Sequence, residues 1–248
     1  MLKDGERLDY VNDDLSLIQN PEGLTFGTDA LLLAGYCSSK KRLGVELGGG
    51  SGIISMLLLA REKLERCICL EIQPEYADLI QRNADLNNLG DRLEAVCTDI
   101  REFSNSEECD LVYSNPPYMR TDSGRRNGSD KKNIARHEVF GGIFDFCHAA
   151  KRLLKYGGTF AVVYRPDRMC DLISALRENS LEPKRITFVG ADKNSAPSML
   201  LCEAKKGGKC GLKITRPLII YSTEDHKAYS EEMEFIMREG VFPPCFDR

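Results

Sequence analysis

The sequence predicts an α/β fold in which a doubly wound, mostly parallel sheet is covered by helices on both faces. Short apolar segments with strand character alternate with helical segments from residue 43 to residue 179, a pattern typical of parallel sheets with helical crossovers. The stretch Gly48–Gly52 directly follows the first of these strands and precedes a helix, which is the first half of a β-α-β unit. Two closing strands lie too close together in sequence for a helix between them, so we expect an antiparallel hairpin there.

Each expected element follows from its periodicity and its end signals. Strands are short apolar runs bounded by turn residues, and helices repeat apolar side chains at helical spacing. Pro74 suits the first turn of a helix. The expected strands are 15–19, 43–47, 66–71, 93–97, 110–113, 159–164, 186–189, 198–203 and 218–221. The expected helices start near residues 30, 53, 75, 142, 168 and 224, and the last runs to residue 239 as a charged tail.

The composition is that of an ordinary globular protein. The 248 residues are 42% hydrophobic and 29% charged, with a formal net charge of −4, and such a chain can bury a sizeable core. It has no apolar run of membrane-spanning length and no signal-peptide core near its start. We therefore expect a cytoplasmic protein without membrane contact, with a strand and helix extension at 1–36, a main domain at 37–221 and a helical tail at 222–248.

The ten cysteines do not indicate a metal site. They are scattered, with no Cys-x-x-Cys pair among them, whereas zinc sites typically use closely spaced pairs. Cys67, Cys69 and Cys97 fall inside expected strands, where a free thiol packs as a small apolar side chain. We expect reduced thiols and no bound metal.

Carboxylates accompany the glycine loop in a regular order. Three alternating glycines follow the first strand: Gly48, Gly50 and Gly52. Glu46 stands two residues before them, Glu71 ends the next strand and Asp99 follows the third. Because the carboxyl ends of parallel strands meet at one edge of a sheet, we expect these groups to gather there.

This pattern suits a cationic ligand that contains adenosine better than it suits a dinucleotide. The dinucleotide fingerprint G-x-G-x-x-G, started at Gly48, puts Ile53 at its third glycine, and started at Gly50 it puts Ser55 there. Carboxylates would also repel a pyrophosphate. We expect Glu71 to accept hydrogen bonds from both hydroxyls of a ribose and Asp99 to meet an adenine amino group. A nicotinamide-dependent dehydrogenase is disfavoured.

The segment Asn115-Pro116-Pro117-Tyr118 ends the fourth of these strands. Prolines stop the hydrogen-bond ladder of a strand and push the preceding residue to an extended conformation. Asn115 is therefore expected at the carboxyl end of a parallel strand, with an aromatic ring three residues further on. A plain turn would use the same residue types, but the glycine loop and the carboxylates upstream favour a functional site.

On these residues, the chain resembles the class I S-adenosylmethionine-dependent methyltransferases of the small-domain type, whose amino-methylating motif matches residues 115–118. More narrowly, Phe-Gly-Thr-Asp-Ala-Leu-Leu at 26–32 and Ala-Arg-His-Glu at 135–138 resemble the bacterial family that methylates the amino group of an adenine beside the anticodon of a valine tRNA. The resemblance implies a Rossmann-like, seven-stranded sheet and S-adenosyl-L-methionine as cofactor, with the extension at 1–36 lying over the cofactor site.

The resemblance also implies a role for each site residue. Asn115 and Pro116 would accept hydrogen bonds from the target amine, Pro117 would keep these acceptors rigid, and Tyr118 would stack on the target ring. The residues implied to bind the cofactor are Glu46, Gly48, Gly50, Gly52, Glu71, Asp99 and Asn115. Thr28 and Asp29 are second choices for cofactor contact, because either can instead cap the helix that follows. No step needs a general base, a metal or a covalent intermediate.

Basic residues surround the motif although the chain is acidic overall. Those expected to contact RNA are Arg120, Arg125, Arg126, Lys131, Lys132 and Arg136. A second basic stretch, from residue 204 to residue 217, contains no acid. We expect RNA as the partner, with tRNA favoured; a solvated charged loop is the alternative.

Two other functions stay open on the sequence. A glutamine side-chain amide in a protein presents the same delocalised nitrogen lone pair as an adenine amine, so the motif would serve either substrate. A non-catalytic module that keeps the cofactor pocket and binds RNA is the third candidate, and the intact Asn115 and Tyr118 argue against it.

Overall fold

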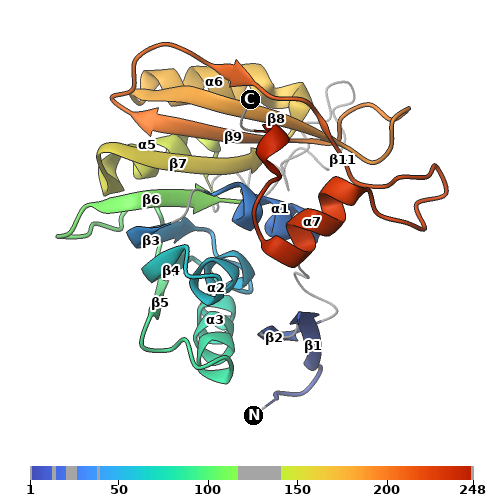
Figure 1. Ribbon diagram of the computed structural model, residues 1–248. Coiled ribbons are helices and arrows are strands. Elements are labelled where there is room, and N and C mark those ends of the chain that lie inside the picture. Colours follow the sequence, from blue (N-terminus) through green and yellow to red (C-terminus); the bar gives the residue numbers. More distant parts are fainter. Residues whose placement is uncertain (1, 13–14, 21–26, 38–39, 117–140, 247–248) are drawn as a thin grey trace, which may run out of the picture.

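The computed structural model describes residues 2–12, 15–20, 27–37, 40–116 and 141–246 (Figure 1). The strands are β1 (Arg7–Asn12), β2 (Leu15–Gln19), β3 (Lys41–Leu47), β4 (Leu64–Glu71), β5 (Leu93–Cys97), β6 (Cys109–Ser114), β7 (Leu154–Tyr164), β8 (Leu181–Gly190), β9 (Met199–Lys206), β10 (Lys213–Ile214) and β11 (Leu218–Ile219). The α-helices are α1 (Thr28–Tyr36), α2 (Ile53–Ala60), α3 (Pro74–Leu86), α5 (Ile143–Leu153), α6 (Met169–Glu178) and α7 (Glu231–Glu239).

The central sheet has the strand order β10-β8-β9-β7-β6-β3-β4-β5, with β11 also paired to β8. Strands β5, β4, β3, β6 and β7 are parallel to one another, and β9 is antiparallel to both β7 and β8. The predicted mostly parallel sheet and its closing hairpin are confirmed. The described sheet has nine strands rather than seven, because the two-residue strands β10 and β11 both pair with β8.

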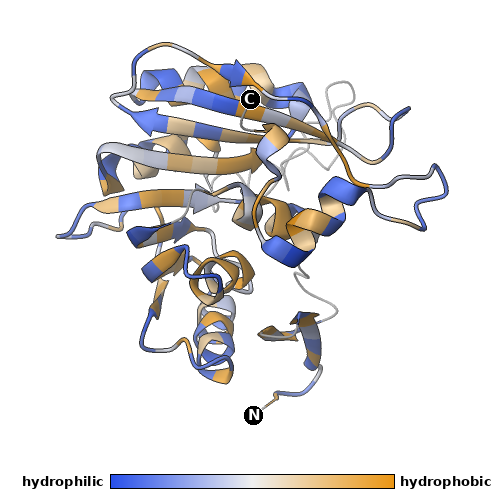
Figure 2. Cartoon of the chain, in the orientation of Figure 1, coloured by the Kyte–Doolittle hydropathy of each residue, from blue (hydrophilic) through white to orange (hydrophobic). Residues whose placement is uncertain are grey.

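Helices cover both faces of this sheet, as a doubly wound fold requires. Side chains from α1, α2, α3 and α7 share one buried cluster, and those from α5 and α6 share another. Successive strand residues alternate between the clusters: Leu111 and Tyr113 of β6 face the first, and Val112 faces the second. In Figure 2, α2 is coloured almost entirely hydrophobic, whereas the loop before α7 is hydrophilic.

The extension, the main domain and the tail predicted at 1–36, 37–221 and 222–248 all contribute side chains to one core. Leu17 of β2, Leu33 of α1 and Ile236 of α7 belong to the same cluster as Leu57 of α2. The predicted boundaries at residues 36 and 221 therefore do not separate hydrophobic cores. In the described part of the chain, no helix has the length and apolarity of a membrane span.

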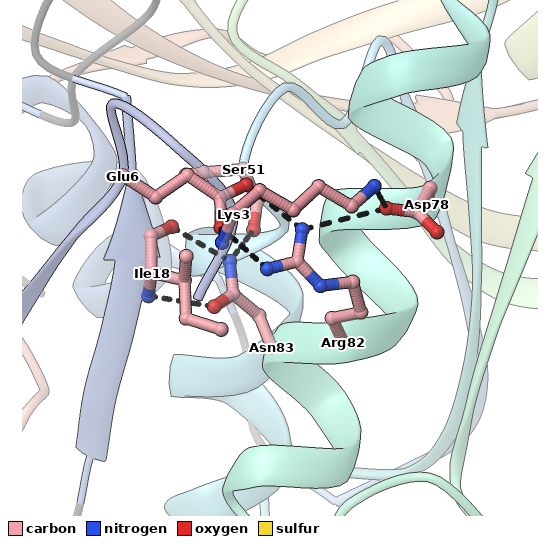
Figure 3. A network of polar contacts seen from close by, with 7 residues as sticks. All are labelled: Lys3, Glu6, Ile18, Ser51, Asp78, Arg82 and Asn83. Atoms are coloured by element: carbon pink, nitrogen blue, oxygen red, sulfur yellow. Dashed lines mark hydrogen bonds and ion pairs between the residues drawn. The ribbon is translucent and has the colours of Figure 1, made fainter. Parts of the chain in front are cut away.

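Polar contacts attach the hairpin β1–β2, with the residues just before it, to α3 and to the glycine loop (Figure 3). Asn83 is fully buried; its Oδ1 accepts the Ile18 N–H at 2.7 Å, and its Nδ2 donates to the carbonyls of Ile18 and Ser51. Arg82 donates through both terminal nitrogens to the Glu6 carboxylate at 2.8 and 2.5 Å. The hydrogen bond from Arg82 lowers the pKa of Glu6 to about 2, so this carboxylate is ionised at neutral pH.

Three local expectations are wrong. Helix α7 begins at Glu231 instead of residue 224, because the Ser230 side chain caps it by accepting the Met233 N–H at 3.1 Å. Strand β1 was not expected, since its mostly exposed side chains leave no apolar run in the sequence. Cys67 and Cys69 are buried as expected, but Cys97 is exposed at the end of the edge strand β5.

A buried lysine holds the end of α1. Lys63 is only 2% exposed, and its Nζ donates to the carbonyls of Ala34, Gly35 and Cys37 at 2.7, 3.0 and 2.9 Å. The last carbonyls of a helix lack partners within it and carry partial negative charge, so an ammonium group suits this place. Burial lowers the pKa of Lys63 to about 8.

Replacing Lys63 should therefore destabilise the fold. Lys63→Met leaves three buried carbonyls without their donor, and we expect the free energy of unfolding to fall by about 2 to 4 kcal/mol in urea titrations at pH 7. Lys193→Met, at an exposed position, is the matched control and should change it by less than about 0.5 kcal/mol. Equal losses in the two variants would contradict this role.

Candidate active site

Strand register brings the predicted site residues to one edge of the sheet. Glu46 of β3 is paired with Tyr113 of β6 on one side and with Cys69 of β4 on the other. Two residues further along these strands come Gly48, Asn115 and Glu71, respectively. Side chains two apart point to the same face, so Asn115 and Glu71 flank the glycine loop on the face that carries α1 and α2.

The glycine loop has a backbone that other residues rarely adopt. Gly48, Gly50 and Gly52 have φ values of +73°, +55° and +79°, in the left-handed region that favours glycine. At Gly49, a Cβ atom would lie 2.2 Å from the Cys69 Sγ. The loop leads directly into α2, whose first turn leaves backbone N–H groups without partners inside the helix.

Two carboxylates stand at the carboxyl ends of the neighbouring strands β4 and β5. Glu71 is 5% exposed; its Oε2 accepts the Gly50 N–H at 2.9 Å and its Oε1 accepts the Gln73 N–H at 3.0 Å. Asp99 accepts hydrogen bonds from the backbone and the guanidinium of Arg101, at 2.8 Å for the Arg101 N–H. The Arg101 side chain lowers the pKa of Asp99, which keeps this group ionised.

Glu46 lies beneath the loop rather than at its surface. It is 1% exposed, and its Oε2 accepts hydrogen bonds from the Ser55 N–H at 3.2 Å, from the Ser55 hydroxyl and from the Cys69 thiol. The Ser55 hydroxyl also bonds with the Tyr113 hydroxyl at 2.7 Å. Burial raises the pKa of Glu46 to about 7 against the opposing hydrogen bonds from Ser55 and Cys69.

Asn115 contacts Asp29, which lies far away in the sequence and was only a second choice for cofactor contact. Its Nδ2 donates to the Asp29 Oδ2 at 2.7 Å, and the Asp29 Oδ1 accepts the Ala30 N–H at 2.9 Å. The expected cap is corrected: α1 begins at Thr28, and its N-cap is Gly27, with no side-chain cap bond. Asp29 is the second residue of the helix rather than its N-cap, and its carboxylate binds the Ala30 N–H with one oxygen and Asn115 with the other.

Part of the predicted site lies outside the described residues. Pro116 is described and buried. The predicted site residues outside the described ranges are Pro117, Tyr118, Arg120, Arg125, Arg126, Lys131, Lys132 and Arg136.

A cleft that sequence analysis missed adjoins Asp29. Its volume is about 530 Å³ and its lining residues are Asp29, Arg165, Pro166, Asp167, Pro197, Ser198 and Met199. Arg165 donates to both oxygens of Asp167 at 2.9 and 2.6 Å. The sequence held one signal for this place: Arg165-Pro166 directly follows a buried strand, as Asn115-Pro116 does.

The far wall of the cleft is the turn between β8 and β9. Asp192 organises this turn by accepting the N–H groups of Asn194 and Ser195 and the Ser195 hydroxyl. The His226 Nε2 lies 3.0 Å from the same carboxylate, and the His226 ring stacks on Tyr221 at 4.6 Å between centroids. The loop before α7 thereby braces the turn.

Two lysines of the second basic stretch lie away from this edge. Lys205 of β9 is paired with Thr159, and the Lys206 Nζ donates to the carbonyl of Leu154, the first residue of β7. These lysines therefore lie toward the amino end of β7, whereas Asn115 follows the carboxyl end of β6. They do not support RNA contact beside the site.

The sequence model of the methyltransferase small domain matches residues 22–179, which contain the glycine loop, all three strand-end carboxylates and Asn115. The chain belongs to this methyltransferase family. The family's donor of the methyl group is S-adenosylmethionine.

Curated relatives of the methyltransferase carry a more specific name. A Parabacteroides distasonis protein named tRNA1(Val) (adenine(37)-N6)-methyltransferase is 28% identical over 219 residues, covering 86% of this chain and 89% of the relative. A Bacteroides fragilis protein of the same name is 32% identical over 180 residues, covering 71% and 74%.

Solved structures agree with the fold. A predicted O-methyltransferase from Agrobacterium tumefaciens has a TM-score of 0.69 at 22% identity, covering 87% of this chain and 98% of that one. The M. jannaschii protein TYW2, in complex with AdoMet, has a TM-score of 0.58 at 14% identity, covering 82% and 86%.

The residues present fit S-adenosylmethionine. Hydroxyls of a ribose and the amino group of an adenine are hydrogen-bond donors, and the carboxylates of Glu71 and Asp99 supply acceptors at neighbouring strand ends. The loop Gly48–Gly52 lies between Glu71 and Asn115 with a backbone that a ligand can approach closely. Within the described ranges, no cluster of three or more His, Cys, Asp or Glu is placed to hold a metal.

The raised pKa of Glu46 predicts a pH dependence of stability. The folded state holds this proton up to about pH 7, whereas the ordinary pKa is 4.5. The resulting stabilisation is present below pH 4.5 and is lost as pH rises through 7. Between pH 5 and 8, the free energy of unfolding of the cofactor-free protein should fall by about 2 to 3 kcal/mol from this group.

Glu46→Gln stays neutral at both pH values and should lack this fall in urea titrations. The difference between the wild-type and variant slopes isolates Glu46 from other titrating groups. Parallel curves for the two proteins would exclude a raised pKa at this residue.

Proposed function

We propose that this methyltransferase transfers a methyl group from S-adenosylmethionine to the exocyclic amine of an adenine in tRNA, next to the anticodon. The main observation is the asparagine that directly follows β6: its side-chain Nδ2 donates to Asp29 at the edge that also holds the glycine loop and Glu71. The names of the relatives support the tRNA substrate.

The chemical problem is a poor nucleophile. The lone pair of an adenine amine is delocalised into the ring, so the amine must be turned and aimed before it attacks. S-adenosylmethionine supplies an electrophilic methyl group on a sulfonium. Asn115 Oδ1 and the Pro116 carbonyl accept hydrogen bonds from the two N–H groups of the amine. These hydrogen bonds favour a pyramidal nitrogen and direct its lone pair.

The cleft beside Asp29 is the candidate place for the target base. A volume of about 530 Å³ accommodates a purine ring with part of its sugar. Pro166, Pro197 and Met199 offer apolar surface to a ring face, and Arg165 and Asp167 offer polar groups to its edge. Tyr118 is proposed to stack on the base. The basic residues from Arg120 to Arg136 are proposed to contact the RNA backbone.

Cofactor contacts are assigned to residues on the other side of the glycine loop. Glu71 accepts from the ribose and Asp99 from the adenine amine, as expected from the sequence. The buried position of Glu46 favours an indirect role, in which it holds Ser55 in the first turn of α2.

Asn115→Ala should abolish transfer while leaving the cofactor site intact. We expect kcat with labelled S-adenosylmethionine and a valine tRNA transcript to fall at least about 100-fold. The dissociation constant for S-adenosylhomocysteine, measured by calorimetry, should change less than about threefold. Loss of methyl transfer together with loss of S-adenosylhomocysteine binding would place Asn115 in cofactor binding instead.

The substrate is tested with paired transcripts that differ at one nucleotide. Wild-type protein should form N6-methyladenosine, detected by nucleoside mass spectrometry, on a valine tRNA whose anticodon is followed by adenine, and none when that adenine is replaced by guanine. Translation release factors serve as the protein substrate in parallel. Label in the release factors alone would show a glutamine amide methyltransferase, and no label in any substrate would favour a binding module.

A further inference from the structure

Asp29 and Asn115 come from segments 86 positions apart and meet in a short hydrogen bond. The Asn115 Nδ2 lies 2.7 Å from the Asp29 Oδ2. The other carboxylate oxygen is also used, since the Asp29 Oδ1 accepts the Ala30 N–H at 2.9 Å. Both oxygens of Asp29 therefore have a donor, and the carboxylate has little freedom to rotate.

The surroundings of Asp29 keep it in this place. Helix α1 is packed through the buried Leu32 and Leu33, and Lys63 binds its last carbonyls. A Cβ atom at Gly27 would lie 2.8 Å from the Asp29 Oδ1, so the absence of a side chain there makes room for the carboxylate. A side chain anchored in this way can orient its partner.

The chemistry of the pair determines which way the asparagine amide faces. Both Asp29 oxygens accept hydrogen bonds from N–H donors, so the amide turns its NH₂ toward Asp29. Because the amide is planar, its Oδ1 then lies on the opposite side. The negative charge also polarises the amide and makes its oxygen a stronger acceptor.

We infer that Asp29 is the positioning residue that aims the Asn115 oxygen at the target amine, and that it is not a cofactor ligand. This inference rests on the proposed function, in which the Asn115 Oδ1 accepts an N–H of the substrate. Without Asp29 the amide can turn over, and its NH₂ would then meet the N–H of the target amine, donor against donor.

The test is a conservative substitution at position 29. In Asp29→Asn, the new amide keeps its oxygen on the Ala30 N–H and turns its NH₂ toward Asn115, which reverses the asparagine. We expect kcat for tRNA methylation to fall about 100-fold, with the dissociation constant for S-adenosylhomocysteine and the melting temperature close to wild type. The matched control, Asp85→Asn on the exposed face of α3, should leave all three values unchanged.

A readout without turnover accompanies these values. The side-chain amide resonances of Asn115, identified in cofactor-free protein by their absence in Asn115→Ala, should shift in Asp29→Asn and stay in place in Asp85→Asn. Asp29→Ala provides a second variant, in which the acceptor is lost without a replacement donor, and its kcat should also fall.

Exchanging the residue types at positions 29 and 115 provides the most specific test of the pair. Asn115→Asp alone faces one carboxylate with another and should be nearly inactive. In the double variant Asp29→Asn with Asn115→Asp, the new amide at position 29 donates to the new carboxylate at position 115, whose second oxygen again faces the substrate. We expect the double variant to be at least about tenfold more active than Asn115→Asp, because the two sites are coupled.

Each result has a defined consequence. Unchanged kcat in Asp29→Asn, or a double variant no better than Asn115→Asp, overturns the positioning role while the proposed function stands, provided that wild type is active and Asn115→Ala is not. Weakened binding of S-adenosylhomocysteine with unchanged kcat would assign Asp29 to the cofactor. Absence of any wild-type methyl transfer defeats the proposed function, and the inference fails with it.

Discussion

The structure depends on one buried carboxylate, Glu46, at the centre of the sheet. It receives hydrogen bonds from Ser55 of α2 and Cys69 of β4, and Ser55 connects it to Tyr113 of β6. Three adjacent strands and the helix after the glycine loop are thus linked through a single acceptor group. Glu71 binds the glycine loop through the Gly50 N–H, and the Glu46 network holds the helix that follows the loop.

Carboxylates perform four separate tasks in the site, according to where each is placed. Glu46 organises the protein interior, Glu71 fixes backbone amides at the surface of the loop, and Asp99 is kept ionised by Arg101. Asp29 contacts a side chain, Asn115, rather than the backbone of a loop. A sequence pattern that shows only acids at strand ends cannot separate these tasks, since each depends on which donor lies within reach.

Much of the fold followed from local pattern. The long strands, the glycine loop and the closing hairpin are encoded by runs of apolar residues and by Gly or Pro at their ends, and these signals are short in range. The strands β1 and β10 carry exposed side chains, so their pairing depends on the sheet edge beside them and leaves no periodic signal. The start of α7 depends on the capping geometry of Ser230, which a charged helical pattern does not reveal.

The site was predictable in its parts and not in its contacts. The register of parallel strands brings Glu71 and Asn115 to one edge, and that consequence of pairing is accessible from the sequence. The meeting of Asp29 with Asn115 depends on how α1 packs across the sheet, and the cleft depends on how the β8–β9 turn is braced by His226. Both are tertiary relations between distant segments, as is the position of Lys205 at the opposite edge.

The N-terminal hairpin shows that the segment matched by a family model and the unit that folds need not coincide. The family match covers residues 22–179, yet the buried amide of Asn83 has its partners in Ile18, before that block, as well as in Ser51. Beyond the other boundary, β9 is inserted between β7 and β8, and Phe246 is fully buried. A fragment cut at the limits of the homologous block would therefore expose β7 as a bare sheet edge and leave polar groups of α3 unsatisfied in its core, so the shortest chain that preserves the methyl-transfer site extends well past the segment by which the family is recognised.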